Sequence, residues 1–252
     1  MIKNLPKSIA LELVPRTLEG LVEESRDCLS KFPITTVNVP EIRTVSVKSY
    51  ESARALIANH IPVTPHFRMV DRSLTELIEM LGVLTSMGLR EVLIIAGDPP
   101  KDLGFQPSGL TSVLAIREIR KLFPTLKIFA GLDPFRTSFR EELDYAKRKL
   151  DAGADGFYTQ PFFSVGMLEQ WMEQIPEAEV WYGIAPVLSE KSKFYWENTN
   201  KVVFPPDFDI TLESNVRTGR ALLKAIADAN QRAYLMPVRV DAAEYVGSLL
   251  ND

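Results

Sequence analysis

The chain has 252 residues, 46% of them hydrophobic and 25% charged, and both values are ordinary for a globular protein. Its formal net charge of -4 provides no basic excess to neutralise phosphates, which argues against nucleic acids and anionic membranes as partners. The single cysteine, Cys28, excludes an internal disulfide, and His60 and His66 are too few histidines for a Cys/His metal cluster.

The first residues, MIKNLPKSIALELVPR, are interrupted by prolines and by Glu12, so they lack the continuous apolar segment of a signal peptide. No apolar run in the sequence approaches the roughly 20 residues that a helix needs to cross a bilayer. Together with the single cysteine, these features predict a cytoplasmic protein, because thiols stay reduced in that compartment.

Apolar runs rich in β-branched residues predict strands, and apolar residues recurring every three or four positions predict helices. The expected strands are residues 9–14, 34–39, 63–70, 91–96, 126–132, 156–160, 180–185 and 233–238. The expected helices are residues 17–31, 49–59, 73–88, 108–122, 138–152, 165–174, 189–198, 211–229 and 241–250. Residues 202–206 are expected to be extended, and no linker or tandem repeat divides the chain.

Local signals support several of these boundaries. Thr17 is expected to cap the first helix, Ser73 and Glu76 have the spacing of a capping box, and Gly88 is a natural helix end. Strands that alternate with helices over this length are typical of a (β/α)8 barrel, so the chain is predicted to be one TIM barrel domain, residues 1–252. A doubly wound open sheet is the alternative, but its GxGxxG fingerprint after the first strand is absent, as is a P-loop.

The stretch EVLIIAGDPP, residues 91–100, reads as a buried strand that stops at an acidic residue followed by two prolines. In a barrel the active site forms at the C-terminal ends of the strands. Polar residues at the expected strand ends are Glu12, Asn38, His66, Arg68, Asp98, Asp133, Arg136, Thr159 and Gln160.

Glu12 lies within an otherwise apolar strand, and charged side chains are rarely buried without a partner. A Glu12 side chain that points into the barrel mouth would have its pKa raised by desolvation, which would make it a proton donor near neutral pH. An ion pair with a nearby arginine such as Arg68 is the alternative interpretation.

Two further strand ends carry side chains suited to a flat ligand. Asp98 follows Gly97, which permits close backbone approach, and its carboxylate either accepts a hydrogen bond from a ligand or caps a turn. The Gln160 amide both donates and accepts, which suits a planar heterocycle. Phe162 and Phe163, which follow, either wall an aromatic ligand or belong to the core.

The remaining candidates are less specific. His66 either contacts a ligand or is a satisfied structural residue, and the sequence offers no motif for a metal site. The charge run 147–149 is expected to be a solvated helix face. No nucleophile elbow is present, so the set of one proton donor, one aspartate, one amide and aromatic walls favours moving a proton or hydride over hydrolysis.

At these residues the sequence resembles the methylenetetrahydrofolate reductase family. LELVPR is similar to the family's E-F-x-P-P, VTPHFRMVDRS to P-H-x-x-x-x-D, and LIIAGDPP to L-R-G-D-P-P. KRKLDAGADGFYTQPFF is similar to K-x-K-x-x-A-G-A-x-x-x-x-T-Q-x-x-F, and YGIAPV resembles P-G-I-x-P-I. The matches follow the family order from the first to the seventh expected strand.

The resemblance implies a (β/α)8 barrel that binds FAD and reduces 5,10-methylenetetrahydrofolate to 5-methyltetrahydrofolate, with NADH, NADPH or another donor supplying electrons. It implies that Glu12 is the acid that helps to open the bridging one-carbon unit, and that Asp98 lies near flavin and pterin. Gln160 and Phe162 are implied to contact the folate. The residues implied to line the flavin site are His66, Gly97, Asp98, Ala130, Arg148 and Lys149. A homo-oligomer or an electron-donating partner subunit is left open.

The sequence also departs from the family pattern. Ala96 stands where the family has an arginine before Gly-Asp, and Leu132 stands where a tyrosine is expected. The strand ends NVPE and AYLMPV differ from the family as well. These departures motivate a second hypothesis, a folate-binding protein of the same fold that has lost FAD and acts as a non-redox partner or regulator. A lyase or aldolase is a third, but the only lysine near an expected strand end, Lys127, begins its strand.

Overall fold

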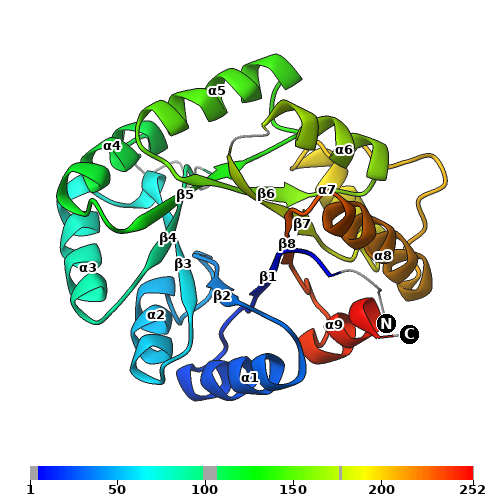
Figure 1. Cartoon of the computed structure of the whole chain (residues 1–252), viewed down its shortest axis with the longest axis horizontal. Helices are drawn as coiled ribbons and strands as arrows, with labels where there is room; N and C mark the ends of the chain where they lie inside the picture. The colour runs from blue at the N-terminus through cyan, green and yellow to red at the C-terminus, as the bar shows by residue number, and fades with distance from the viewer. Residues whose placement is uncertain (1–4, 99–106, 176–177, 252) are drawn as a thin grey trace.

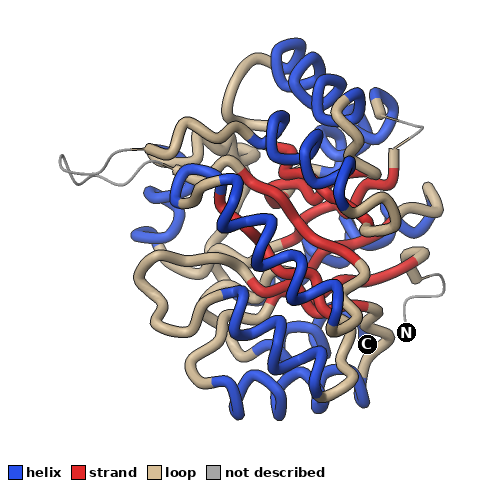
Figure 2. Tube along the Cα trace, turned by 90° about the vertical axis from the view of Figure 1, so that its left-hand side faces the viewer, coloured by secondary structure: helices blue, strands red, loops and turns tan. Residues whose placement is uncertain are grey.

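A computed structural model of the chain describes residues 5–98, 107–175 and 178–251. Its strands are all parallel and close into a barrel in the order β1-β2-β3-β4-β5-β6-β7-β8. Helices surround the barrel on the outside, as Figure 1 shows looking along it and Figure 2 from the side. The proline pair of the predicted turn after Asp98 lies outside the described residues.

The strands are short and each is followed by a helical connection to the next. Their bounds are β1 (Ser8–Glu12), β2 (Thr36–Val39), β3 (Val63–Arg68), β4 (Glu91–Ile95), β5 (Lys127–Leu132), β6 (Gly156–Pro161), β7 (Glu179–Ile184) and β8 (Arg232–Leu235). The helices are α1 (Leu18–Lys31), α2 (Ser49–Ala58), the 3-10 turn η1 (Met69–Asp71), α3 (Leu74–Ser86), α4 (Ser112–Leu122), α5 (Phe139–Asp151), α6 (Val165–Gln174), α7 (Glu190–Asn198), α8 (Leu212–Asp228) and α9 (Ala242–Leu250).

The predicted TIM barrel is confirmed, and the open doubly wound sheet is wrong because β1 pairs with β8 and closes the sheet. The predicted cap at Thr17 is also confirmed, since its side chain accepts from the amide of Gly20. At Ser73 the hydroxyl accepts from the amide of Glu76 at 3.2 Å, as in a capping box. The Glu76 carboxylate lies 3.9 Å from Arg72.

Two predicted boundaries are wrong for identifiable reasons. The helix expected from residue 108 begins at Ser112, because Thr111 caps it while the Ser108 hydroxyl donates to the carbonyl of Met69. The strand expected over 63–70 ends at Arg68, where the backbone tightens into η1. In both cases a side-chain or turn hydrogen bond overrides a hydrophobic pattern that continues past the boundary.

Two layers of apolar side chains hold the barrel together. The outer layer lies between strands and helices, and it includes fully buried Leu11, Val37 and Ile94. The inner layer fills the barrel itself and consists of Ala10, Leu93, Phe129, Tyr158, Trp181, Ala185, Tyr234 and Met236. Successive residues of a strand point to opposite faces, so each strand supplies both layers.

Aromatic rings dominate the inner layer. Tyr158 stacks on Trp181 with ring centroids 5.3 Å apart, and Phe129 meets both rings edge-on. At the N-terminal end of the barrel, Glu179 pairs with Lys127 at 3.0 Å and with Arg232 at 3.3 Å. The barrel interior is therefore a packed core closed at one end by ion pairs, which leaves the C-terminal mouth as the place for a site.

No helix in the described part of the chain combines the length and apolarity that crossing a membrane requires.

Candidate active site

Glu12 is the last residue of β1 and the centre of the candidate site. Ala10, two residues earlier, belongs to the inner layer, so strand alternation also directs Glu12 toward the barrel interior. The neighbouring strand β8 places Tyr234 opposite Ala10, and the Tyr234 hydroxyl donates a hydrogen bond to Glu12 Oε2. Burial raises the pKa of Glu12 to about 7, while the hydrogen bond from Tyr234 acts in the opposite direction.

The ion pair between Glu12 and Arg68 that the sequence left open does not form. The Arg68 guanidinium instead lies 2.6 Å from Asp71 and donates to the backbone carbonyl of Asp98 at 2.7 Å. Within the described residues, Glu12 has no ion-pair partner. Its side chain is half-buried and its carboxyl group lacks a counter-charge, which is the condition under which a carboxylic acid keeps its proton near neutral pH.

His66 on β3 contacts Asn38, which is in register with Glu12, and Tyr234, which hydrogen-bonds Glu12. Its side chain is buried, and its Nε2 atom lies 3.1 Å from the Asn38 amide nitrogen, from which it accepts. Burial lowers the pKa of His66 to about 3, so the imidazole is neutral at physiological pH. Its ring meets Tyr234 edge-on with centroids 6.4 Å apart. Glu12, Tyr234, Asn38 and His66 are called the mouth network below.

The end of β4 carries Gly97 and Asp98, as predicted. Gly97 has φ +77, and a Cβ atom there would lie 2.9 Å from both Arg68 Nε and Val70 Cγ1. Glycine is thus required at this position, because the backbone passes close to the side chains of Arg68 and Val70. Asp98 follows it as an exposed residue whose carbonyl is held by Arg68.

Gln160 is presented by a β-bulge in β6. Tyr158 pairs with Trp181 and Pro161 with Gly183, so β6 has one more residue than β7 across this interval. The amide of Gly183 donates to the Thr159 hydroxyl at 2.8 Å. Bulges re-aim side chains at barrel rims, and this one leaves Gln160 half-buried at the strand end.

The phenylalanines after the bulge take different places. Phe162 is 1% exposed in the outer layer and tilts against Tyr182 with centroids 6.1 Å apart. Phe163 joins Trp196 and Phe204 in a separate aromatic cluster after β6 and β7. The structure therefore places Phe162 between strands and helices, away from the position of a wall in the mouth.

Three residues that the resemblance assigns to the flavin also lie in other contacts. Ala130 is fully buried in the outer layer, facing the helices. Arg148 is exposed on α5, with its guanidinium 5.0 Å from the centre of the Tyr145 ring. Lys149 is 3% exposed, and its Nζ atom donates to the carbonyl of Gly131 at 2.7 Å.

A second group of buried charges surrounds Lys149. Glu142 is 1% exposed and pairs with the Arg136 guanidinium, and it lies 3.7 Å from Lys149 Nζ. The Asp133 amide donates to Glu142 at 3.1 Å. Burial lowers the pKa of Lys149 to about 8, with Glu142 opposing the shift, and burial raises the pKa of Asp133. These four residues are called the β5–α5 charge cluster below.

The sequence alone missed the residue that contacts Glu12 most directly. Tyr234 was part of an expected strand, and its role depends on the register between β8 and β1. Asn38 was named as a strand-end residue but had no assigned partner. The available signal was the alternation of β1, since whatever strand lies beside Ala10 also lies beside Glu12.

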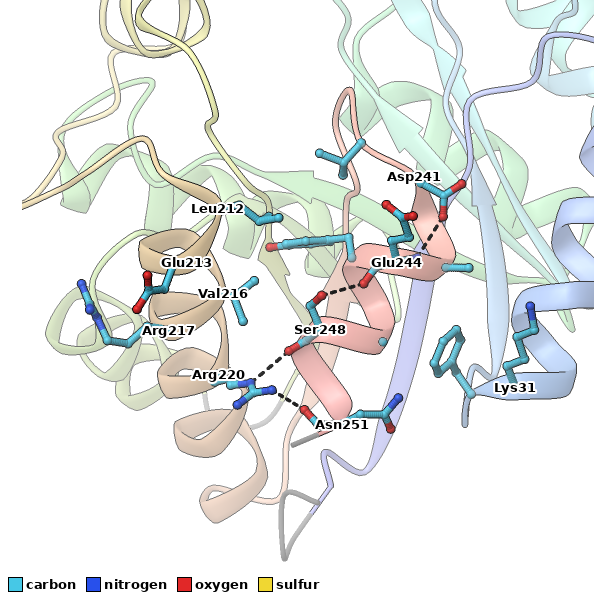
Figure 3. Close-up of a pocket in the computed structure, with 15 residues that line it drawn as sticks. Lys31, Leu212, Glu213, Val216, Arg217, Arg220, Asp241, Glu244, Ser248 and Asn251 are labelled. Carbon is cyan, nitrogen blue, oxygen red and sulfur yellow. Dashed lines mark hydrogen bonds between the residues drawn. The ribbon is translucent and has the colours of Figure 1, made fainter.

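A groove also exists on the outside of the barrel, between α8 and α9 (Figure 3). Its volume is about 1220 Å³, and Lys31 and Phe32 of the α1 end complete its lining. Arg220, in its wall, donates to the backbone carbonyls of Ser248 and Asn251. This cation ties α8 to the end of α9, and the lining of the groove includes no residue of the mouth network.

In the described ranges, no three His, Cys, Asp or Glu side chains gather closely enough to hold a metal ion.

In the comparison with known proteins, a family model and several curated relatives point to the same family. The family model described as methylenetetrahydrofolate reductase matches residues 33–229, most of the chain but neither Glu12 nor Tyr234.

Curated relatives carry the same description. The 5,10-methylenetetrahydrofolate reductase of Buchnera aphidicola subsp. Schizaphis graminum is 29% identical over 106 residues, which are 42% of this chain and 36% of that protein. The enzyme of that name from Escherichia coli (strain K12) is 27% identical over 147 residues, 56% of this chain and 49% of the relative. The aligned part thus spans only about a third to a half of the length of these relatives.

Solved structures share the architecture at low identity. An oxaloacetate acetylhydrolase has a TM-score of 0.58 at 10% identity, with 96% of this chain and 79% of that chain covered. QR15, an aldolase, has a TM-score of 0.58 at 13% identity, with both chains covered to 100%. At such identities the likeness establishes the barrel fold and carries no information on the reaction.

Proposed function

This chain belongs to the methylenetetrahydrofolate reductase family, and from that membership we propose that it reduces 5,10-methylenetetrahydrofolate to 5-methyltetrahydrofolate, with Glu12 as the acid. The observation that carries the proposal is the state of Glu12. Its carboxyl group lies at the C-terminal mouth without a counter-charge, and its pKa is raised to about 7. A general acid works best when its pKa lies close to the working pH.

The chemistry of the substrate explains why such an acid is useful. The one-carbon unit bridges two nitrogens, and protonation of N10 by Glu12 lets the bond between N10 and the carbon break. The electron pair of N5 then makes the carbon an iminium, which accepts a hydride and becomes the methyl group. The reaction consumes one proton and one hydride, and the described residues offer Glu12 as the source of the proton.

Other residues of the mouth have binding roles in this proposal. Gln160, presented by the bulge, offers a donor and an acceptor to the edge of the pterin. Asp98, exposed at the end of β4, accepts from ring N–H groups. His66 stays neutral and presents no charge that would oppose a cationic iminium.

The flavin that the family implies does not fit three of the residues expected to hold it. Ala130 faces the helices, Lys149 is engaged by Gly131 and Glu142, and the space beside Gly97 is filled by Arg68 and Val70. At these three positions the protein's own contacts take the place that a flavin would need. We therefore assign no step to a flavin. The hydride donor is either FAD or a reduced nicotinamide, and spectra and turnover of the purified chain distinguish the two.

The test begins with the purified chain. Absorption spectra with and without added FAD show whether a flavin is taken up, and the oxidation of NADH or NADPH is followed with and without methylenetetrahydrofolate. Folate-dependent oxidation of the nicotinamide, with formation of methyltetrahydrofolate, is the expected result. A chain that binds neither donor nor folate and forms no product contradicts the proposal.

The Glu12→Gln variant then tests the acid. The amide keeps the shape of the side chain but carries no acidic proton, so folate reduction is expected to fall about 10²- to 10⁴-fold. The exposed Glu23→Gln variant on α1 is the matched control and should keep full activity. Equal activity of the wild type and Glu12→Gln rules Glu12 out as the acid.

A second candidate function is folate binding without redox chemistry. It is favoured by the engagement of Ala130 and Lys149 in other contacts and by Ala96, which stands where the family has an arginine. Calorimetric titration distinguishes the two. Tight folate binding, with no uptake of FAD and no oxidation of a nicotinamide, supports the non-redox function, whereas turnover excludes it.

A further inference from the structure

The two oxygens of the Glu12 carboxyl group have different surroundings. Oε2 accepts a hydrogen bond from the Tyr234 hydroxyl, and within the described residues no hydrogen bond reaches Oε1. A neutral carboxyl group carries its proton on one oxygen only. Because Oε2 is already an acceptor, the proton of the neutral acid belongs on Oε1.

We propose that Tyr234 is the positioning residue of the Glu12 acid: its hydroxyl holds Oε2 and leaves Oε1 to carry the proton toward the ligand. The proposal rests on the proposed function, in which Glu12 is the acid. It gives a role to a side chain of β8, a strand that lies outside the segment matched by the family model.

Tyr234 is suited to this role because it donates in both states of Glu12. Burial and the neighbouring carboxylate raise the pKa of Tyr234 well above its ordinary value of 10. The phenol therefore keeps its proton whether Glu12 is protonated or ionised. The carboxyl group is held in one orientation before and after it gives up its proton, which spares reorganisation during the reaction.

The surroundings hold Tyr234 itself in place. The side chain of Asn38, which is paired in register with Glu12 across β1 and β2, lies near the Tyr234 hydroxyl. Asn38 is fixed in turn by His66 at 3.1 Å. The Tyr234 ring meets Tyr158 edge-on with centroids 5.0 Å apart. The Tyr234 ring therefore packs against rings of β3 and β6.

Among the described residues, few titratable groups face Glu12, so its protonation reports mainly on burial and on Tyr234. β8 contributes Tyr234, β3 contributes the neutral His66, and β6 contributes Tyr158, whose pKa burial raises well above 10. Arg68 of β3 is engaged by Asp71. A change in the pKa of Glu12 upon substitution of Tyr234 can therefore be read without interference from a nearby charge that titrates in the same range.

The decisive measurement is an infrared titration of the Glu12 carboxyl group in the full chain. The carboxylic C=O band of Glu12 is identified as the one absent from Glu12→Gln, and its loss is followed with pH. In the wild type the midpoint is expected near 7. In Tyr234→Phe the carboxylate loses its donor, so the midpoint should rise by about 1 pH unit or more.

Tyr158→Phe is the matched control. It removes a hydroxyl from a buried tyrosine of the same inner layer, one that does not hydrogen-bond Glu12. The control should leave the Glu12 midpoint unchanged. In turnover, Tyr234→Phe should lower kcat about 10-fold or more with little change in the KM for folate, and the alkaline limb of its pH profile should move upward with the carboxyl midpoint.

A measurement on the wild type covers the case in which Tyr234→Phe does not fold. Proton NMR of the protein should show a slowly exchanging phenolic proton whose shift changes with the midpoint of Glu12, and this pH dependence should vanish in Glu12→Gln. An unchanged Glu12 midpoint in Tyr234→Phe, an equal shift in Tyr158→Phe, or a phenolic signal that ignores Glu12 overturns the proposal. A shifted midpoint in a chain that turns over no folate rejects the proposed reductase function and retains the pairing.

Discussion

Glu12, half-buried at the barrel mouth, and Glu142, fully buried near the start of α5, both carry carboxyl groups shielded from water, but their partners differ. Glu12 is met by the neutral hydroxyl of Tyr234. Glu142 is met by Arg136 and Lys149, two cations, and by the amide of Asp133. One carboxyl group is buried without a counter-charge and the other with two.

The difference explains what each group can do. Without a counter-charge, desolvation raises the pKa of Glu12 into the neutral range, where a proton can be given and regained. Within the β5–α5 charge cluster, the opposite charges offset part of the desolvation, so the cluster stays ionic and joins the end of β5 to α5. Of these two carboxyl groups, Glu12 is therefore the candidate for proton transfer.

The largest effect is expected from breaking the charge cluster. Glu142→Gln leaves Lys149 and Arg136 without their buried counter-charge, and the free energy of unfolding should fall by about 3 to 5 kcal/mol. Urea denaturation measures this value. The exposed Glu169→Gln on α6 is the control and should change stability by less than ~0.5 kcal/mol. A loss no greater than that of the control would mean that the cluster does not support the fold.

A smaller effect is expected from the titration of Glu12. Its folded-state pKa, about 7, lies above the ordinary value of 4.5, so between these values the folded state keeps a proton that the unfolded chain has released. The contribution of Glu12 to stability is therefore fully present below pH 4.5, declines as pH rises to 7 and stays lost above it. The decline is ~3 kcal/mol at most.

This decline is measured as the difference in unfolding free energy between the wild type and Glu12→Gln over that pH range. The variant has no proton to lose, so it should become more stable relative to the wild type as pH rises. Parallel stability curves for the two proteins would contradict a raised pKa of Glu12 and would remove the contrast with Glu142.

The smallest effect is expected from Tyr158→Phe. The Tyr158 hydroxyl is buried and has no direct hydrogen-bond partner of good geometry among the described residues. Removing a polar atom that is not hydrogen-bonded costs little, so the free energy of unfolding should stay within ~1 kcal/mol of the wild type. Thermal and urea unfolding together measure the change. A loss of several kcal/mol would show that the hydroxyl takes part in a bridged network inside the barrel.

Much of the fold could be predicted from the sequence because the barrel repeats one local pattern. Each strand is a short apolar run and each helix has its own periodic face, so α6 was expected at its observed bounds and the expected strands appear in order. The errors lie where a local hydrogen bond decides the boundary, as at Thr111 before α4. The Thr111 cap is made within the helix, and the Ser108 hydroxyl donates to the carbonyl of Met69, and hydrophobic spacing reports neither bond.

The candidate site divides in the same way. The unusual position of Glu12 inside an apolar strand could be recognised from the sequence, since a charge there is costly unless it has a purpose. Its neighbour could not be recognised, because Tyr234 reaches Glu12 only after β8 closes the barrel against β1, 222 residues away along the chain. Ala130 shows the converse, since its motif assigned it to a ligand and strand alternation turned it toward the helices.

The sequence by itself determined the barrel, the family and the presence of an acid at a strand end, because these follow from periodicity and from the order of short motifs. Only the tertiary structure decided which buried charges are paired. Desolvation and Coulomb attraction act over a few ångströms of space, and the closure of the sheet sets those distances. It brought a neutral phenol to Glu12 and two cations to Glu142, and that assignment of partners separates the group proposed to carry the chemistry from the group that supports the fold.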